Sequence, residues 1–163
     1  MPFYQFQMQS PLTTETILVR IRALVHEPPG SYQSVREAFG SRADGRPPFI
    51  GRVEGTHFHM RRDIRYRNSF LPRVRGSVVQ NPVGANVKVT MYLRPLVAAV
   101  MLLWLGAVGL GTLAVVTNER ESMVPALLPA GMFSFGIVLV VVGFYPEVYK
   151  ARRLLEQGVR NGV

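Results

Sequence analysis

The pattern of apolar and polar residues divides the chain into two halves. In the second half, residues 95–116 form a run of 22 residues without a charged side chain, and residues 124–146 form another of 23. At about 1.5 Å per residue, either run would cross a hydrocarbon core of roughly 30 Å as a single helix. A soluble protein would need a large polar shell to cover both helices, and the remaining residues are too few to supply it. The pattern therefore predicts two transmembrane helices.

The first half begins with a predicted strand and a predicted helix. Residues 3–8 alternate with a period of two, which is typical of a strand. Ser10 and Pro11 suit the start of a helix, with serine as the N-cap and proline at the first helical position. The apolar positions that follow recur at the spacing of one helix face: Ile17, Ile21 and Leu24. Residues 19–22 also alternate as a strand would, and residues 26–47 are predicted to be mainly loop.

A period of two returns at Pro48 and continues to the first apolar run. It predicts strands near residues 49–54, 57–65, 74–78 and 87–93, with turns at Gly55-Thr56 and Pro82-Val83-Gly84. Short links between such strands are typical of an antiparallel meander with one buried face. We therefore predict an α+β fold, in which a small antiparallel sheet of about five strands and one packed helix precede a two-helix transmembrane hairpin.

These patterns suggest three parts along the chain. Residues 1–94 form a basic α+β domain, and residues 95–146 form the hairpin, with helices at 95–116 and 124–146. Residues 147–163 form a short amphipathic tail. We expect the apolar side chains of this tail to lie at the membrane surface, with its basic residues among the lipid headgroups.

The distribution of charge predicts on which side of the membrane the domain lies. Residues 1–94 hold 14 Lys or Arg against 6 acids, and residues 147–163 hold four against two. The link at residues 117–123 has one Arg and two Glu. Basic segments beside a span stay on the cytoplasmic side. We therefore expect a multi-pass protein of the inner (cytoplasmic) membrane, with both termini in the cytoplasm.

Small residues recur four positions apart in both apolar runs. They are Ala107 and Gly111 in the first run, and Ala130 and Ser134 in the second. Such faces let helix backbones approach closely in lipid. The faces could pack the hairpin on itself or join two copies of the chain. Neither run contains Asp, Glu, Lys, Arg or His, which argues against a pump or a coupled transporter.

The residues that most often carry catalysis or bind metals are sparse. The chain has no cysteine, so disulfides and thiolate chemistry are excluded. His57 and His59 would share one strand face, with His26 and Asp63 as further candidate ligands. Zinc needs three or four converging ligands, and the arginines of that face would repel a cation. Ser69 lacks the Gly-x-Ser-x-Gly turn of a hydrolase. We expect no catalytic residue, no cofactor and no metal.

Positive charge is the strongest functional signal in the sequence. Six arginines fall between residues 61 and 75: Arg61, Arg62, Arg65, Arg67, Arg73 and Arg75. The basic residues predicted on the polar face of the sheet are Arg61, Arg65, Arg73, Arg75 and Lys88. Beside an anionic leaflet, each such charge is worth about 1 kcal/mol. We therefore expect a non-enzymatic module that docks on anionic lipid or on a partner protein.

Other interpretations of the basic segment remain open. The charges could belong to an ordinary solvated face with a positive-inside bias. A nucleic-acid-binding module would stack bases on Tyr66, Phe70 and Tyr92, although no RNA-binding signature is present and membrane tethering argues against it. A small membrane enzyme would need a polar, partly buried cluster, which the sequence does not reveal.

One motif lies among these arginines. It consists of Tyr66, Arg67, Asn68, Ser69, Phe70, Leu71 and Pro72. Its composition predicts a structural corner, in which Asn and Ser bind local backbone, Pro sets the exit angle and the apolar pair enters the core; a recognition loop is the alternative. Together with Phe49-x-Gly51, Phe58 and Gly76, the motif resembles an uncharacterised bacterial family of two-span membrane proteins. The resemblance implies the same layout and brings no activity.

The predicted topology can be tested with reporter fusions. A reporter that is active only in the cytoplasm should be active when fused after Val163 and inactive when fused at Asn118. The opposite activities would reverse the predicted orientation and contradict the argument from charge.

Overall fold

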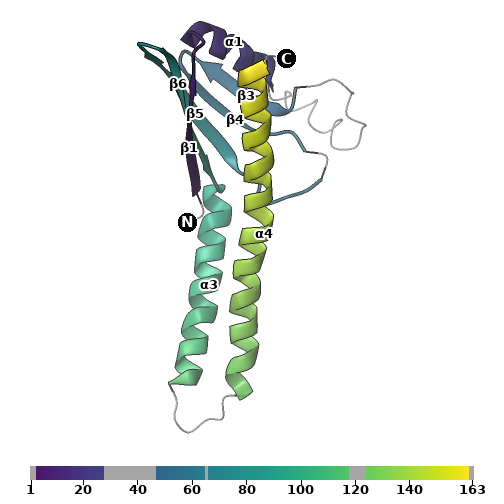
Figure 1. The fold of residues 1–163 in the computed structure, drawn as a ribbon. Helices are drawn as coiled ribbons and strands as arrows, with labels where there is room; N and C mark the ends of the chain where they lie inside the picture. The colour runs from purple at the N-terminus through teal and green to yellow at the C-terminus, as the bar shows by residue number, and fades with distance from the viewer. Residues whose placement is uncertain (1–2, 28–46, 65, 118–123, 162–163) are drawn as a thin grey trace.

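The protein consists of a six-stranded sheet carried at one end of two long helices (Figure 1). The computed structural model describes residues 3–27, 47–64, 66–117 and 124–161. The elements, in chain order, are β1 (Phe3–Ser10), α1 (Thr14–Ala23), β2 (Val25–His26), β3 (Phe49–Glu54), β4 (His57–Arg62), β5 (Arg73–Asn81), β6 (Gly84–Tyr92), α3 (Pro95–Val116) and α4 (Val124–Asn161).

The strands are ordered β1-β6-β5-β4-β3-β2 across the sheet. Strands β3 to β6 form an antiparallel meander, and β1 pairs antiparallel with β6 at the other edge. The predicted α+β class is confirmed. The sheet has one strand more than expected because the two residues of β2 pair parallel with β3. Two residues are too few to produce an alternating pattern, so the sequence gives no sign of this strand.

Helix α1 begins three residues later than Ser10 and Pro11 suggest. Ser10 instead ends β1, where it pairs with Ala85 of β6. The N-cap is Thr13, whose side-chain oxygen accepts a hydrogen bond from the backbone N–H of Thr16 at 3.3 Å. The predicted apolar face of the helix is confirmed, because Ile17, Ile21 and Leu24 are all buried.

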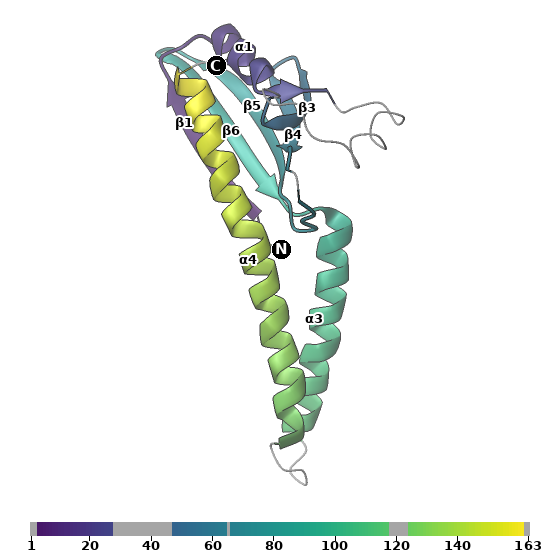
Figure 2. The ribbon, with the colours of Figure 1, turned by 90° about the vertical axis from the view of Figure 1, so that its right-hand side faces the viewer.

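One face of the sheet is covered by α1 and by the C-terminal part of α4, as Figure 2 shows. The buried side chains of the strands point towards these two helices and form one core with them. The largest of them are Phe49, Phe58, Met91, Val74, Val78, Val87 and Val89. The opposite face carries no helix among the described residues, and we call it the open face.

Helix α4 continues without a break from its apolar first part into the domain. It runs over 38 residues, from Val124 to Asn161, and contains Pro146. The side chains of Val148, Ala151, Leu155 and Val159 recur on one face and are buried against the sheet and α1. Residues 147–161 are therefore part of the domain, which corrects the expected location of the tail's apolar face at the membrane surface. The stripe of apolar residues is real, but the sheet covers it.

Helix α3 and the first part of α4 lie side by side (Figure 1). Many of their large apolar side chains are exposed. Both helices are long and apolar enough to cross a membrane. In the most apolar stretch of α3 none of the residues is buried, and in that of α4 11% of the residues are buried. Neither helix therefore resembles the core helix of a soluble protein. Helix α3, at Pro95–Val116, has the bounds of the first predicted span, and the second helix extends 15 residues beyond Pro146.

The contact between α3 and α4 uses small residues other than the predicted pair Ala107 and Gly111. Trp104 packs against Gly136, where an added Cβ would lie 2.3 Å from the indole ring, and Phe133 packs against Gly109. Ala107 and Gly111 are exposed, and nothing lies within 4 Å of a Cβ added at Gly111. The hairpin therefore does not pack through this pair.

The burial of α4 on the sheet predicts the effect of shortening one of its side chains. Leu155 is 1% exposed, so Leu155→Ala should lower the free energy of unfolding by about 2–5 kcal/mol. Denaturant unfolding of the full chain in neutral detergent would measure this change. Gln157→Ala, at an exposed position of the same helix, should change it by less than about 0.5 kcal/mol. Equal effects would mean that this part of α4 does not pack on the sheet.

Candidate functional site

The open face of the sheet is organised in rows that run across the strands. Neighbouring residues in a row are cross-strand partners, and successive rows lie two residues, or about 7 Å, apart. The first row is nearest to the spans and comprises Ile50, Arg61, Arg73, Tyr92 and Phe3. The second comprises Arg52, His59, Arg75, Thr90 and Gln5, and the third Glu54, His57, Ser77, Lys88 and Gln7. We call the end of the sheet at the first row the span end.

Positive charge is concentrated at the span end of the open face. The first two rows contain four arginines and no acid, a net charge of +4. In the third row Lys88 and Glu54 cancel, and the outermost row is Val79, Asn86 and Gln9. Since Tyr92 ends β6 and α3 begins at Pro95, the Tyr92 end of the first row lies at most roughly 10 Å along the chain from the start of α3.

The structure places most of the predicted basic residues on this face. Arg61, Arg73, Arg75 and Lys88 occupy the predicted side of their strands and are exposed. Arg65 lies outside the described residues. Arg52 lies on the same face, as the alternation in β3 predicts. It was not among the predicted basic residues because it lies outside the arginine-rich segment at residues 61–75.

Three of the arginines line a shallow hollow of about 430 Å³ at the span end. Arg61 comes from β4, whereas Arg73 and Arg75 come from β5. The hollow is also lined by Ile50, Gly51, His59, Met60, Val74 and Tyr92. The guanidinium carbon of Arg75 lies 5.0 Å from the centre of the Tyr92 ring, so this side chain leans towards the spans. Among the lining residues in the described part of the chain, none is acidic.

The histidines do not converge on one another. His57 and His59 are exposed on the open face, and His26 forms an ion pair with Asp63 instead, with 3.6 Å between Nε2 and the carboxylate. Within the described residues, no group of three or more His, Asp or Glu is placed to hold a metal ion.

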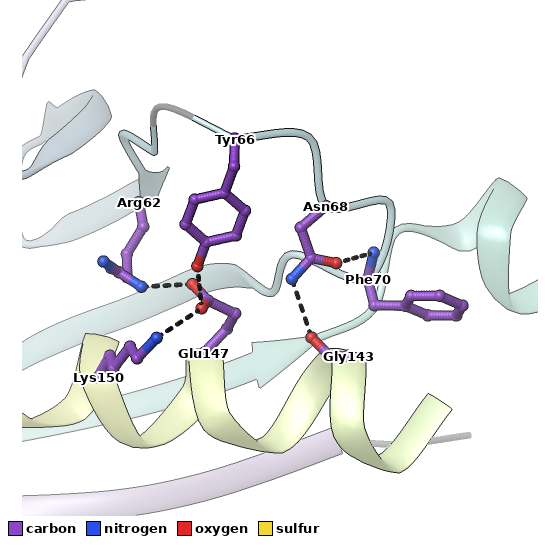
Figure 3. Close-up of polar contacts among 7 residues, drawn as sticks. All are labelled: Arg62, Tyr66, Asn68, Phe70, Gly143, Glu147 and Lys150. Carbon is purple, nitrogen blue, oxygen red and sulfur yellow. Dashed lines mark hydrogen bonds and ion pairs between the residues drawn. The ribbon is translucent and has the colours of Figure 1, made fainter. Parts of the chain in front are cut away.

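A second polar cluster lies where α4 enters the domain (Figure 3). The carboxylate of Glu147 is 3% exposed and follows directly after Pro146. It accepts hydrogen bonds from Arg62 of β4 and from the Tyr66 hydroxyl, and it pairs with the Lys150 ammonium at 3.4 Å. A buried carboxylate is stable only when such donors surround it. We call these four residues the Glu147 cluster.

Tyr66 keeps its proton in this arrangement. Its hydrogen bond to Glu147 raises the pKa of the phenol above 10.0, and partial burial and the negative charge of Glu147 act in the same direction. Since the pKa is raised, Tyr66 is a donor at all pH values near neutrality, and its contribution to stability is lost only as the pH rises past 10.

The motif at residues 66–72 joins the sheet to α4 beside this cluster. Asn68 accepts a hydrogen bond from the backbone N–H of Phe70 at 2.9 Å and donates one to the carbonyl oxygen of Gly143 at 3.0 Å (Figure 3). Phe70 lies against Gly143, where an added Cβ would be 2.7 Å from its ring. Pro72 is buried, Leu71 is half-buried, and Arg67 and Ser69 are exposed. These contacts are those of a corner that holds α4.

The Glu147 cluster could not be read from the sequence as a cluster. Glu147 is 85 residues from Arg62 and 81 from Tyr66 along the chain. One signal pointed to it, since Arg62 falls on the same strand face as Phe58 and Met60. An arginine on a covered face needs a carboxylate partner, and the partner had to come from another element.

Comparisons with known proteins give no relative for this fold and these sites. No family model matches the chain, and no curated protein or solved structure matches it. The resemblance suggested by the motif at residues 66–72 therefore stays a prediction.

The Glu147 cluster predicts a large difference between two substitutions in one helical turn. Glu147→Ala leaves the mostly buried Arg62 without its carboxylate and should lower the free energy of unfolding by about 3–5 kcal/mol. Lys150→Gln removes a partner that is 57% exposed and should cost less than about 1 kcal/mol. Denaturant unfolding in neutral detergent would measure both. If Glu147→Ala were as mild as Lys150→Gln, the cluster would not hold α4 to the sheet.

Proposed function

We propose that this protein is a two-span, non-enzymatic membrane module that binds anionic lipid headgroups with the span end of its open face. The observation that carries the proposal is the gradient of charge along that face. A net charge of +4 lies in the two rows nearest the spans, and the next two rows are neutral.

The position of the rows fits the headgroup layer of a bilayer. The headgroup region adds about 5–8 Å to each side of the hydrocarbon core. In Figures 1 and 2 the strands run towards the start of α3, in roughly the direction of the two long helices. The first row therefore lies close to the headgroups, and the third is about 14 Å farther away. That is beyond the screening length of about 8 Å at physiological salt.

The proposed orientation places this surface at the cytoplasmic leaflet. The flanks of both helices on the domain side carry most of the positive charge, as the positive-inside rule requires. The cytoplasmic leaflet is also the one that carries anionic lipids, and each basic residue near it contributes about 1 kcal/mol of attraction. The charges that orient the protein thus serve as its binding surface.

Other functions have less support in the geometry. An acidic partner protein could meet the same arginines, but it would not require them to be concentrated beside the spans. A nucleic acid would need stacking aromatics on the open face, where Tyr92 already contacts Arg75, and Tyr66 and Phe70 are engaged with α4. A catalytic role for Glu147 has little support, because three donors already occupy this carboxylate.

The proposal predicts which lipids stay with the protein on purification. The full chain, extracted in mild detergent from vesicles of mixed neutral and anionic lipid, should retain anionic lipid in preference, as measured by mass spectrometry. Retention should fall stepwise in Arg61→Gln, then in Arg61→Gln with Arg73→Gln, and then with Arg75→Gln added, because exposed charges contribute small and similar amounts. About 0.5 M salt should release most of the retained anionic lipid.

Lys88→Gln provides the comparison within the same face. It removes the same charge from the third row and should reduce retention less than Arg73→Gln does. A wild-type protein that retains neutral and anionic lipid in their bulk proportions would refute the proposed function. Equal effects of Lys88→Gln and Arg73→Gln would refute the argument from distance.

A further inference from the structure

Three of the described arginines of the domain are held by other parts of the protein. Arg62 binds Glu147, Arg152 binds Glu156 at 2.6 Å, and Arg20 donates to the carbonyl oxygen of Val159 at 2.7 Å. In contrast, Arg61 and Arg73 have no hydrogen bond or ion pair to any described residue. Their guanidinium groups are thus available to a ligand.

Arg61 and Arg73 are also direct cross-strand partners. Like charges directly opposite each other on a sheet destabilise it. Arg75 leans over Tyr92, the cross-strand partner of Arg73, and so adds a third positive charge to the same hollow. None of the described residues that line the hollow carries a carboxylate to offset this repulsion. An anion bound among the three guanidinium groups would remove it.

We propose that this hollow is a binding site for a phosphomonoester headgroup of a membrane lipid. A phosphomonoester carries a charge of about −1.5 to −2 at neutral pH and has three free acceptor oxygens. Guanidinium groups match such oxygens in paired hydrogen bonds. A phosphodiester has a single charge and two free oxygens, so it would engage fewer of the three arginines. The inference rests on the proposed function and gives it a ligand class.

The size and position of the hollow favour a lipid over a soluble phosphate. Its volume of about 430 Å³ exceeds the needs of a phosphate ion and leaves room for the glycerol backbone beside the phosphate. It lies in the first two rows, next to the start of α3, where the headgroups of lipids around the spans would reach it. The apolar side chain of Ile50, in the first row of the open face, lines it together with the arginines.

The test compares two lipids that differ in the phosphate group. The full chain in neutral detergent is titrated with short-chain phosphatidic acid, a phosphomonoester, and with short-chain phosphatidylglycerol, a phosphodiester, at pH 7.5. Binding is followed as the rise in thermal unfolding temperature, since a ligand of the folded state stabilises it. Phosphatidic acid should bind about tenfold more tightly than phosphatidylglycerol, the factor expected from one further charge-assisted hydrogen-bonding pair. Inorganic phosphate alone should bind more weakly than the short-chain phosphatidic acid.

Single substitutions locate the preference. Arg61 and Arg73 are both exposed. The substitutions Arg61→Gln and Arg73→Gln should each bring the ratio of the affinities for phosphatidic acid and phosphatidylglycerol close to one. Arg153→Gln removes the same charge from an exposed position of α4, away from the hollow, and should leave the ratio unchanged.

The possible outcomes separate this inference from the proposed function. Equal affinity for the two lipids, both above that for a neutral lipid, would overturn the phosphomonoester site and leave anionic docking intact. Binding of neither lipid would overturn both. Inorganic phosphate that binds as tightly as phosphatidic acid would overturn the lipid as the source of the phosphate. A ratio that falls in Arg153→Gln as much as in Arg73→Gln would show that the preference does not come from the hollow.

Discussion

The packing of the C-terminal part of α4 on the sheet is the interaction on which the rest of the structure depends. The same helix that leaves the apolar hairpin supplies Val148, Ala151, Leu155 and Val159 to the core of the domain. Without them, one face of a sheet of modest size would be covered by α1 alone. The domain therefore does not end where the first span begins. Residues 147–161 complete it from the other end of the chain.

The entry of α4 into the domain combines two kinds of contact. The Glu147 cluster holds the helix through a buried charge, and the Asn68 side chain holds it through the carbonyl oxygen of Gly143. The burial of Glu147 is tolerable only because Arg62 and Tyr66 come to it from the sheet side. The cluster is thus evidence of a defined register between α4 and the sheet. A helix shifted by one residue would turn Glu147 away from both donors.

Much of the fold could be predicted because the sheet has one covered face. That constraint produces a strict period of two, from which the strands, the turn at Gly55 and the polar side of each strand follow. Gly76 shows a finer effect of the same packing, since the ring of Phe58 occupies the space where a Cβ would lie. The predicted start of α1 was wrong because Ser10 serves equally well as a helix cap and as the last residue of a strand. Only the pairing of Ser10 with Ala85 decides between the two.

The sites were less accessible from the sequence, for a physical reason that differs between them. Alternation places Arg61, Arg73 and Arg75 on one face, but their grouping into rows depends on the register between strands. The apolar stripe of residues 148–159 would suit a membrane surface or a sheet, and sequence alone does not distinguish the two. The Glu147 cluster requires elements more than 80 residues apart to meet. Such contacts are properties of the tertiary structure and leave only an isolated arginine on an apolar face as a trace.

The two connections between the sheet and the helices have a mechanical consequence. Only Leu93 and Arg94 separate β6 from α3, and α4 enters the domain without any linker. Helices that span a bilayer respond to a change in its thickness by tilting. With both connections this short, a tilt of the helices must be accompanied by a reorientation of the sheet or by bending at Pro146. In the proposed bilayer arrangement, the inclination of the domain is therefore coupled to the thickness of the surrounding lipid.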